Sequence, residues 1–376
     1  MVQYAKLGDL GEIFIGLTYK PENVASEGTI VLRSSNIQDG ELDFNDIVRV
    51  NCMVRENLFV KPNDILMCSR NGSAKLVGKC TLLPTMSEPV TFGAFMTIIR
   101  TPYNGYLRHF FDSAAFRNQI KGSATTTINQ ITRKMLDDVL VPIFDDKTQN
   151  QISEQFSSID RLISLRKQQL AKLDELVKAR FVELFGDKRY PEDTLLNLCN
   201  IIDYRGKTPE KVESGLPFIT AKNVRMHQMN LEPREYISKE TYDKVMVRGF
   251  PKEGDVVFTT EAPLGNVCRI PHFDTEFYIG QRIVTLQTEK LEPIYLEYAL
   301  SSDDFKMKYM GKSSGSTVTG IRVRLLEQLT IPVPPMELQK QFAAFVEQTD
   351  KSKLAIQQSL DKLETLKKSL MQKYFG

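Results

Sequence analysis

Side chains that can read DNA bases gather in short polar loops of this 376-residue sequence. The loops lie at residues 33–36, 69–75 and 123–130 in the first half, and at 220–223, 259–261 and 312–319 in the second. Arginine, lysine, asparagine and glutamine can hydrogen-bond to base edges, whereas serine, threonine and backbone amides bind phosphates. One such loop alone is typical of an ordinary solvated turn. Recurrence at matching places in both halves favours a binding role.

We therefore predict that these loops bind nucleic acid. In the first half the candidate residues are Arg33, Ser34, Ser35, Asn36, Ser69, Arg70, Asn71, Lys75, Thr127, Asn129 and Gln130. In the second half they are Thr220, Lys222, Asn223, Thr259, Thr260, Lys312, Ser316 and Thr317, and outside these loops Arg205, Lys207 and Thr208 are further candidates. The formal net charge is only +2, so a DNA-binding surface has to come from the placement of charge and not from an excess of it.

Motifs for catalysis and cofactor binding are missing from the sequence. It has no Asn/Asp-Pro-Pro-Tyr/Phe motif of the kind with which amino-methyltransferases hold the target nitrogen, no Gly-x-Gly-x-x-Gly after a strand and no Walker loop. The five cysteines include no Cys-x-x-Cys pair and the three histidines are scattered, so neither a disulfide framework nor a zinc site is indicated. We expect a non-catalytic chain with no metal or cofactor of its own.

The sequence is a tandem repeat of one unit, with the boundary after Gly186. Pro142 matches Pro332 and Asn36 matches Asn223, and other landmarks follow in the same order in both halves. A repeat of this length predicts two copies of one fold, each a globular domain followed by a long helix.

Each half ends in a long stretch without glycine or proline, between Pro142 and Gly186 and between Pro335 and Gly376. Apolar residues there follow the alternating four–three spacing of a coiled-coil seam. The seam residues are Ile152, Phe156, Ile159, Ile163, Leu170, Leu173, Val177 and Leu184 in the first stretch, and Phe342, Val346, Ile356, Leu360, Leu363 and Leu370 in the second. The polar residues Arg166, Arg180, Lys353 and Lys367 interrupt it, and they either fix the register or lie at solvated edges.

Neither long helix is expected to be stable alone, so we predict that the two pair antiparallel. This places one globular domain at each end of the pair, related by a pseudo-twofold axis, with the chain termini close together. Roughly 35 helical residues at ~1.5 Å each make a rod of about 50 Å, long enough to act as a spacer.

The predicted fold class is α+β, with two tandem mixed domains separated by an antiparallel two-helix coiled coil. The predicted boundaries are a globular domain at 1–145, a helix at 146–186, a second globular domain at 187–335 and a second helix at 336–376. Short strands are expected at 30–32, 64–67 and 95–99, with counterparts at 218–219, 255–258 and 282–286. Helices with aromatic faces are expected at 106–120 and 294–309.

The stretch 311–342 contains Gly315-Ser316, Leu325-Leu326, the proline-rich segment 329–335 and Glu337-Leu338-Gln339. With Gly206-Lys207-Thr208-Pro209 and the segment 254–260, these motifs resemble the specificity subunits of type I restriction–modification enzymes. The resemblance covers essentially the whole chain. The first half departs from it, because 141–145 lacks the double proline and Tyr19 replaces the proline after Thr18.

The resemblance implies that 1–145 and 187–335 are target-recognition domains, each of which reads one half of a bipartite target in double-stranded DNA. It also implies that the paired helices set the gap between the half-sites and dock methyltransferase subunits, two of them. Those subunits would carry S-adenosylmethionine, and restriction endonuclease subunits would join the complex. With no membrane span or signal peptide in the sequence, the expected location is the cytoplasm.

Two other functions remain open at this point. The first is a non-catalytic scaffold that binds protein or carbohydrate ligands on a coiled-coil strut. Co-purification without a methyltransferase, together with no footprint on DNA, would favour it. The second is an autonomous methyltransferase, against which the missing Pro-Pro motif argues.

Overall fold

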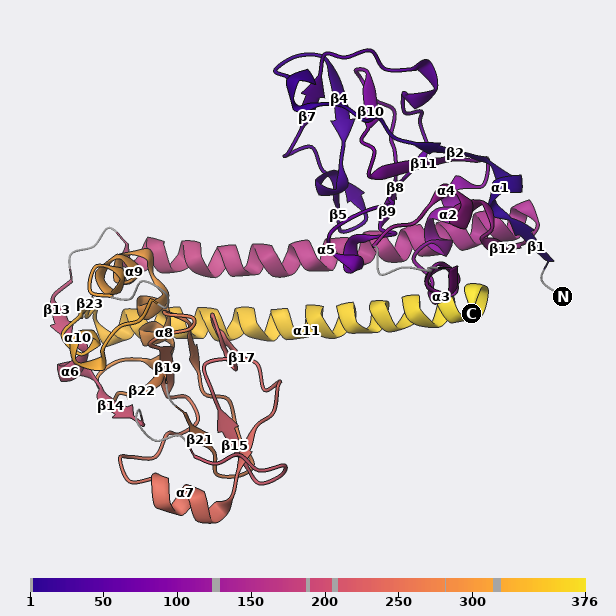
Figure 1. Ribbon diagram of the computed structural model, residues 1–376. Coiled ribbons are helices and arrows are strands. Elements are labelled where there is room, and N and C mark those ends of the chain that lie inside the picture. Colours follow the sequence, from indigo (N-terminus) through magenta and orange to yellow (C-terminus); the bar gives the residue numbers. More distant parts are fainter. Residues whose placement is uncertain (1–2, 124–128, 187–189, 205–208, 281, 314–318) are drawn as a thin grey trace. The chain divides into compact units, whose positions relative to one another are not determined.

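The computed structural model describes residues 3–123, 129–186, 190–204, 209–280, 282–313 and 319–376 (Figure 1). It divides into two units. Unit 1 comprises Met1–Gln168 and Gln357–Gly376, and unit 2 comprises Gln169–Ile356. Each unit therefore contains one globular domain and one segment from each of the two long helices.

The globular domain of unit 1 is built on an antiparallel sheet and a mixed sheet. The antiparallel sheet has the order β2 (Glu12–Ile15), β11 (Met96–Arg100), β8 (Ile65–Cys68), β9 (Cys80–Leu82). The mixed sheet has the order β10 (Val90–Phe92), β4 (Thr29–Leu32), β7 (Val48–Val50), β3 (Val24–Ala25), and β10 runs parallel to β4. Two-stranded pairs are β1 (Gln3–Lys6) with β12 (Leu140–Ile143), and β5 (Ile37–Gln38) with β6 (Glu41–Leu42). The helices are α1 (Leu7–Leu10), α2 (Asn104–Phe110), α3 (Ala114–Ser123) and α4 (Arg133–Asp137), with 3-10 turns η1 (Pro21–Asn23), η2 (Ser34–Asn36), η3 (Glu56–Leu58) and η4 (Ala74–Leu76).

Unit 2 repeats this plan. Its antiparallel sheet has the order β14 (Asn200–Asp203), β22 (Ile283–Gln287), β19 (Val256–Thr259), β20 (Val267–Arg269). Its mixed sheet has the order β18 (Tyr236–Ile237), β15 (Leu216–Ile219), β21 (Tyr278–Ile279), and β21 runs parallel to β15. The pairs are β13 (Glu192–Thr194) with β23 (Thr330–Pro332), and β16 (Val224–Arg225) with β17 (Gln228–Met229). The helices are α6 (Leu195–Leu198), α7 (Lys239–Val245), α8 (Pro293–Ser301), α9 (Asp303–Met310) and α10 (Val323–Leu326).

The strands predicted from short apolar runs are present to within about two residues at each end, the accuracy expected of such boundaries. In the central strands β8 and β19 every residue is buried, which explains why both read as continuous apolar runs and not as alternating patterns. The expected α+β class is confirmed by this mixture of sheets and helices.

The two predicted aromatic helices are each split in two, which corrects the single spans 106–120 and 294–309. A serine causes the break in both units by capping the second helix. Ser113 Oγ accepts a hydrogen bond from the Phe116 amide (3.2 Å), and Ser302 Oγ accepts one from the Phe305 amide (3.2 Å). Serine favours the N-cap position over the helix interior, so this signal was present in the sequence.

The repeat extends to single hydrogen bonds inside each unit. In unit 1 the Tyr106 hydroxyl donates to the Pro142 carbonyl (2.6 Å), and in unit 2 the Tyr295 hydroxyl donates to the Pro332 carbonyl (2.7 Å). Each bond ties the first aromatic helix to the strand that leads into a long helix. The matched prolines of the sequence therefore stand at equivalent structural positions.

The long helices are α5 (Asp146–Phe185) and α11 (Met336–Phe375). All predicted seam residues are buried or half-buried: Ile152, Phe156, Ile159, Ile163, Leu170, Leu173, Val177, Leu184, Phe342, Val346, Ile356, Leu360, Leu363 and Leu370. In unit 1 the pairing is antiparallel, because Gln155 lies opposite Tyr374 and Asp160 lies opposite Lys367.

Two of the polar interruptions form ion pairs across the helix pair. In unit 1 Lys367 Nζ lies 2.6 Å from Asp160 Oδ1, and in unit 2 Lys353 Nζ lies 2.6 Å from Asp174 Oδ1. Both lysines are about three-quarters buried. These partners on the opposite helix favour the register-fixing interpretation over a merely solvated edge. Each pair is nonetheless worth only about 0–1 kcal/mol in a partly solvated position.

The seam also completes the core of each globular domain. In unit 1 Phe156 stacks on Phe375 and on His109, and in unit 2 Phe342 contacts Phe181, Phe185 and Tyr298. Domain and helices therefore share one apolar core within each unit. None of the described helices combines the length and apolar composition needed to cross a membrane.

Candidate nucleic-acid interface

Three of the predicted polar loops of unit 1 meet at the end of β8. The Ile131 amide donates to the Ser69 carbonyl (2.7 Å), which joins the loop before α4 to the loop after β8. The Asn71 side chain donates to Ser34 Oγ (3.1 Å), which brings in the turn after β4. We call the described residues 33–36, 69–75, 93–95 and 129–131 the unit 1 loop cluster.

The corresponding loops of unit 2 meet in the same way at the end of β19. The Ile321 amide donates to the Thr260 carbonyl (2.9 Å), and the Thr260 amide donates to the Arg282 carbonyl (2.8 Å). The Asn266 side chain donates to the Val224 carbonyl (2.9 Å) and so joins the turn after β15. We call the described residues 220–224, 259–266, 282 and 319–321 the unit 2 loop cluster.

Asn36 clamps the turn after β4 from the inside. Its Oδ1 accepts the Arg33 amide (2.8 Å), and its Nδ2 donates to the carbonyls of Asp43 (2.9 Å) and Asp46 (3.0 Å). The side chain is 1% exposed. These three hydrogen bonds all join the side chain to backbone atoms, so the amide fixes the two ends of the segment that carries the β5–β6 hairpin.

Asn223 makes the same set of bonds in unit 2. Its Oδ1 accepts the Thr220 amide (2.9 Å), and its Nδ2 donates to the carbonyls of Asn230 (2.9 Å) and Pro233 (3.3 Å). The accepting carbonyls stand seven and ten residues after the asparagine, as they do from Asn36 to Asp43 and Asp46. This agreement makes the clamp the most closely repeated feature of the two clusters.

Burial corrects part of the predicted binding set. The side-chain amides of Asn36 and Asn223 are buried and already bonded to the backbone. Ser69, Thr259 and Thr260 are also buried. Ser69 Oγ donates to the Phe95 carbonyl (3.1 Å), and Thr259 Oγ1 accepts the Asn266 amide (2.8 Å). Side chains that are enclosed in this way cannot reach a base, so their role is to hold the loops.

Several other predicted residues are half-buried and bonded within the clusters. The Arg33 guanidinium is paired with Asp46 (2.7 Å), and the Asn129 side chain donates to the Gly72 carbonyl (3.0 Å). Asn71 and Thr220 bond to neighbouring loop groups, and Ser34 and Ser35 are likewise half-buried. The predicted residues that remain exposed are Arg70, Lys75, Gln130, Lys222 and Lys312. The predicted residues Thr127, Arg205, Lys207, Thr208, Ser316 and Thr317 lie outside the described residues.

Three residues of the clusters were missed as candidates: Phe95 and Arg282, which are exposed, and Glu261, which is half-buried. Phe95 and Arg282 were interpreted as the first residues of strands, yet both precede the strand and belong to the adjoining loop. Glu261 was part of the predicted loop 259–261 but was not among its candidate residues. The sequence feature that could have identified them is their position at the end of a predicted strand, where a side chain can face the neighbouring loops.

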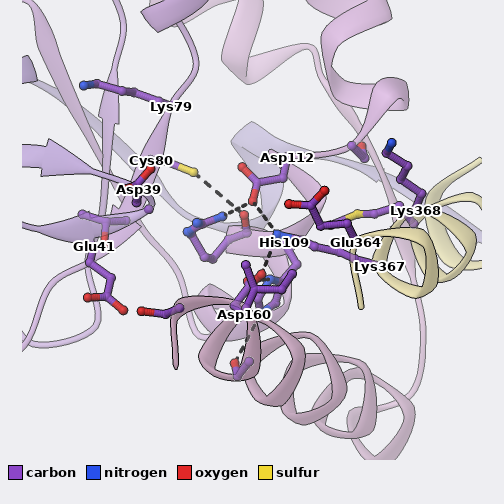
Figure 2. A pocket seen from close by; sticks show the side chains of 18 of the residues that line it. Asp39, Glu41, Lys79, Cys80, His109, Asp112, Asp160, Glu364, Lys367 and Lys368 are labelled. Atoms are coloured by element: carbon purple, nitrogen blue, oxygen red, sulfur yellow. Dashed lines mark hydrogen bonds and ion pairs between the residues drawn. The ribbon is translucent and has the colours of Figure 1, made fainter. Parts of the chain in front are cut away.

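A second feature of unit 1 is an open groove of about 1320 Å³ (Figure 2). It is lined by the β5–β6 hairpin, β9, α2, α3 and the two long-helix segments. Its charges are of both signs, including Asp39, Glu41, Glu364, Lys79 and Lys368. This mixture does not favour a polyanion, so the groove is a poor place for duplex DNA.

The groove contains a partly buried charge network around His109 (Figure 2). Asp112 pairs with Arg108 (2.7 Å), and Asp160 pairs with Lys367 (2.6 Å). His109 Nδ1 lies 3.7 Å from Asp160 Oδ2, too far for a good hydrogen bond. Burial, and secondly the charge of Arg108, lower the pKa of His109 to about 4. The imidazole is therefore neutral at neutral pH.

Reactive groups are scarce among the described residues. Burial raises the pKa of Cys80, Cys199 and Cys268 to about 12, so these thiols are poor nucleophiles. Among the same residues, no three His, Cys, Asp or Glu side chains are grouped so that they could hold a metal ion. What the two clusters offer chemically is hydrogen-bond donors and acceptors on a fixed backbone.

Comparison with known proteins gives a consistent match. The sequence matches the family model of the type I restriction modification DNA specificity domain at residues 1–175 and 194–367. The EcoKI specificity subunit of Escherichia coli is 24% identical over 399 residues, which cover 96% of this chain and 85% of that protein.

Two solved structures have a similar fold. The S subunit of a type I restriction–modification system from M. genitalium has a TM-score of 0.61 at 15% identity, and the match covers 100% of this chain and 96% of that one. A chain from a structure on complex assembly and conformational transition of the type I R-M system has a TM-score of 0.57 at 19% identity, with 99% and 97% covered. At these identities the likeness shows a common fold.

The hydrogen bonds of Asn36 and Asn223 predict that substitution of these asparagines lowers stability, whereas substitution of a neighbouring exposed residue does not. Asn223→Ala leaves the Thr220 amide and two carbonyls without their partner, and we expect it to lower the free energy of unfolding by about 1–3 kcal/mol. Asn36→Ala should do the same in unit 1. The control Lys222→Ala alters an exposed side chain and should stay within about 0.5 kcal/mol. Equal thermal stability of the Asn223 and Lys222 variants would contradict the clamp.

His109 predicts a loss of stability in acid. Its pKa in the folded chain is about 4 against an ordinary value of 6.5, so between these pH values the unfolded chain binds more protons. Stability is therefore lost as the pH falls through this window, by up to about 3 kcal/mol. His109→Phe keeps the stack on Phe156 and removes the titration. Urea unfolding at pH 7 and pH 4.5 should show a smaller loss in this variant, and equal losses would refute the assignment.

Proposed function

Because this chain belongs to the family of type I restriction–modification DNA specificity proteins, we propose that each globular domain reads one half of a bipartite target in double-stranded DNA. The chain is a specificity subunit, a non-catalytic component that associates with DNA and with the other subunits of its restriction–modification system. Residues 1–145 and 187–335 are then the two target-recognition domains, and α5 and α11 carry the spacer segments.

The main support for the proposal is that the two loop clusters have the same backbone arrangement but different exposed side chains. The two loop clusters share their clamps and their cross-loop hydrogen bonds, yet their exposed side chains differ. One cluster presents Arg70 and Lys75, whereas the other presents Lys222. A shared frame with different side chains fits a target with two unlike halves, because base readout depends on side chains and not on the frame.

The small net charge fits a division of labour within the complex. Phosphate contacts release counterions and dominate affinity, and they require many cations. The clusters expose few, namely Arg70, Lys75, Lys222 and Arg282. We infer that the partner subunits make most of the phosphate contacts, and that this chain mainly supplies base readout. A steep salt dependence of DNA binding by this chain alone would count against that division.

The helices supply the docking surface for the modification subunits in this proposal. Leu176 in unit 2 is 50% exposed and Leu366 in unit 1 is 47% exposed, and they stand at matching positions of the repeat. A partner that covers an exposed leucine removes apolar surface from water, which favours association. Two equivalent surfaces fit two copies of one methyltransferase, which would bind S-adenosylmethionine itself, and restriction endonuclease subunits would join this assembly.

The spacer length would set the gap between the half-sites, and the complex would act in the cytoplasm, together with the DNA that it modifies. A scaffold for protein or carbohydrate ligands is not favoured, because the family match spans both globular domains. The autonomous methyltransferase is not favoured either, since the relatives are specificity subunits.

Genome-wide methylation tests the function directly. We expect co-expression of this chain with its cognate modification subunit, in a host without adenine methylation, to produce methylated adenines within one motif of two defined parts and an undefined gap. The modification subunit alone is the control and should yield no such motif. Base-resolution sequencing of the modified genome provides the measurement. Absence of any motif from an assembled complex would refute the proposal.

The docking surfaces predict a change in stoichiometry. We expect Leu366→Asp and Leu176→Asp each to remove one modification subunit, because each places a charge in an apolar contact, and the double variant to remove both. Val247→Asp in unit 2 and Met53→Asp in unit 1 change exposed apolar residues outside the long helices and should leave binding intact. Native mass spectrometry counts the bound subunits. Two bound copies in the double variant would exclude these surfaces.

A further inference from the structure

One pair of residues in each loop cluster occupies the same place in the backbone. In unit 1 the amides of Ser69 and Arg70 donate to the Phe95 carbonyl (2.9 and 3.1 Å), and Arg70 forms an isolated β-bridge with Gln130. In unit 2 the Thr260 amide donates to the Arg282 carbonyl (2.8 Å), and Glu261 forms an isolated β-bridge with Gly320. Arg70 therefore corresponds to Glu261, and Phe95 corresponds to Arg282.

The unit 1 pair is a cation stacked on an aromatic ring. The guanidinium carbon of Arg70 lies 5.2 Å from the centre of the Phe95 ring, and Phe95 is 56% exposed. Stacking orients the guanidinium plane without using its hydrogen-bond donors. No hydrogen bond or ion pair to another described residue occupies these donors, so they are available to a ligand.

The unit 2 pair is an ion pair at the surface. Arg282 Nε lies 2.8 Å from Glu261 Oε1, and the two side chains are 54% and 40% exposed. Only one nitrogen and one oxygen are used in this contact, so two donor groups of Arg282 and one acceptor of Glu261 remain without a partner among the described residues. Arg282 has a φ of 68°, a left-handed conformation that is uncommon for arginine and that tends to persist at functional sites.

The surroundings hold both pairs in position. Ser69 and Thr260, the residues beside Arg70 and Glu261, are buried and bonded to the partner residue of the pair. The asparagine clamps fix the adjoining turns. A fixed backbone with exchangeable side chains at one exposed point is what a specificity-determining position requires.

We propose that Arg70–Phe95 and Glu261–Arg282 are the specificity-determining pairs of the two recognition domains, an inference that rests on the proposed function. Arg70 donates two hydrogen bonds to O6 and N7 of a guanine, and the Phe95 ring contacts the methyl group of a neighbouring thymine. In the other half-site Glu261 accepts a hydrogen bond from N4 of a cytosine, and Arg282 donates to the paired guanine. The two domains thus place different chemistry at one shared position.

Substitutions that change the preferred base test the inference. Glutamine pairs with adenine through N6 and N7, so we expect Arg70→Gln to replace a guanine by an adenine at one position of one half-site. Glu261→Gln should relax the preference for cytosine at one position of the other half-site. Loss of one good base contact should reduce discrimination roughly 5- to 150-fold. The methylated motif of each variant, co-expressed with the modification subunit, provides the readout.

Matched controls carry the same chemical change elsewhere in the same domains. Arg55→Gln changes an exposed arginine of unit 1 outside its loop cluster, and Glu240→Gln changes an exposed glutamate on α7 of unit 2. Both should leave the motif as in the wild type. If Arg70→Gln abolishes methylation altogether, the variant Arg70→Lys tests the role of Arg70 instead. A lysine still donates to guanine, so this variant should keep the original base with weaker discrimination.

The possible outcomes distinguish failure of the assigned pairs from failure of the proposed function. An unchanged motif in Arg70→Gln and Glu261→Gln, in complexes that methylate normally, would overturn the assigned pairs and leave the specificity subunit in place. So would undiminished discrimination by Arg70→Lys. Absence of a motif from the wild-type complex would instead remove the proposed function. A changed base in one half-site, with the other half-site intact, supports the assignment.

Discussion

The apolar seam of the long helices is the interaction on which each unit depends. A helix of 40 residues with a narrow apolar stripe cannot bury that stripe alone, and the pairing of α5 with α11 covers only part of it. The rest packs into the globular domain, where Phe156 and Phe375 join one core and Phe185 and Phe342 join the other. Neither the domains nor the helices have a complete core without the other.

Because the stabilising core lies elsewhere, the exposed residues of the loop clusters can differ between the two units. The buried residues that stabilise each unit lie in the sheets, the aromatic helices and the seam, away from the exposed side chains of the clusters. The clusters keep their shape through local bonds, chiefly the amides of Asn36 and Asn223. An exposed side chain can therefore change with little effect on folding, and the chemistry of readout can diverge between two copies of one fold.

The sequence predicted those parts of the structure that follow from periodicity and repetition. Spacing alone gave the seam from Ile152 to Leu370, and the matched landmarks gave two copies of one fold. Asparagine 36 was expected to face DNA because amides read adenine, but an amide binds a loop carbonyl equally well, and only the tertiary arrangement decides between these partners. The correspondence of Glu261 with Arg70 follows from the predicted counterpart strands 64–67 and 255–258. Spacing did not predict that each of these residues stands beside the residue before another strand, Phe95 or Arg282, because that depends on which strand ends lie side by side.

A carboxylate at a DNA-reading position has an electrostatic cost, and the structure shows how unit 2 can bear it. Each phosphate near the half-site repels Glu261, and the exposed site screens this repulsion only in part. Arg282 lies within hydrogen-bonding distance of the carboxylate, so the pair approaches DNA with no net charge. The carboxylate can then act through its hydrogen-bond acceptor, which among the bases favours the amino groups of cytosine and adenine and disfavours guanine O6 and N7. In unit 1 the same position holds Arg70, whose guanidinium forms no ion pair with another described residue; it attracts the phosphates and favours guanine. The two domains differ at this point by the sign of one charge, so in the proposed assignment Arg70 reads a guanine and Glu261 reads a cytosine.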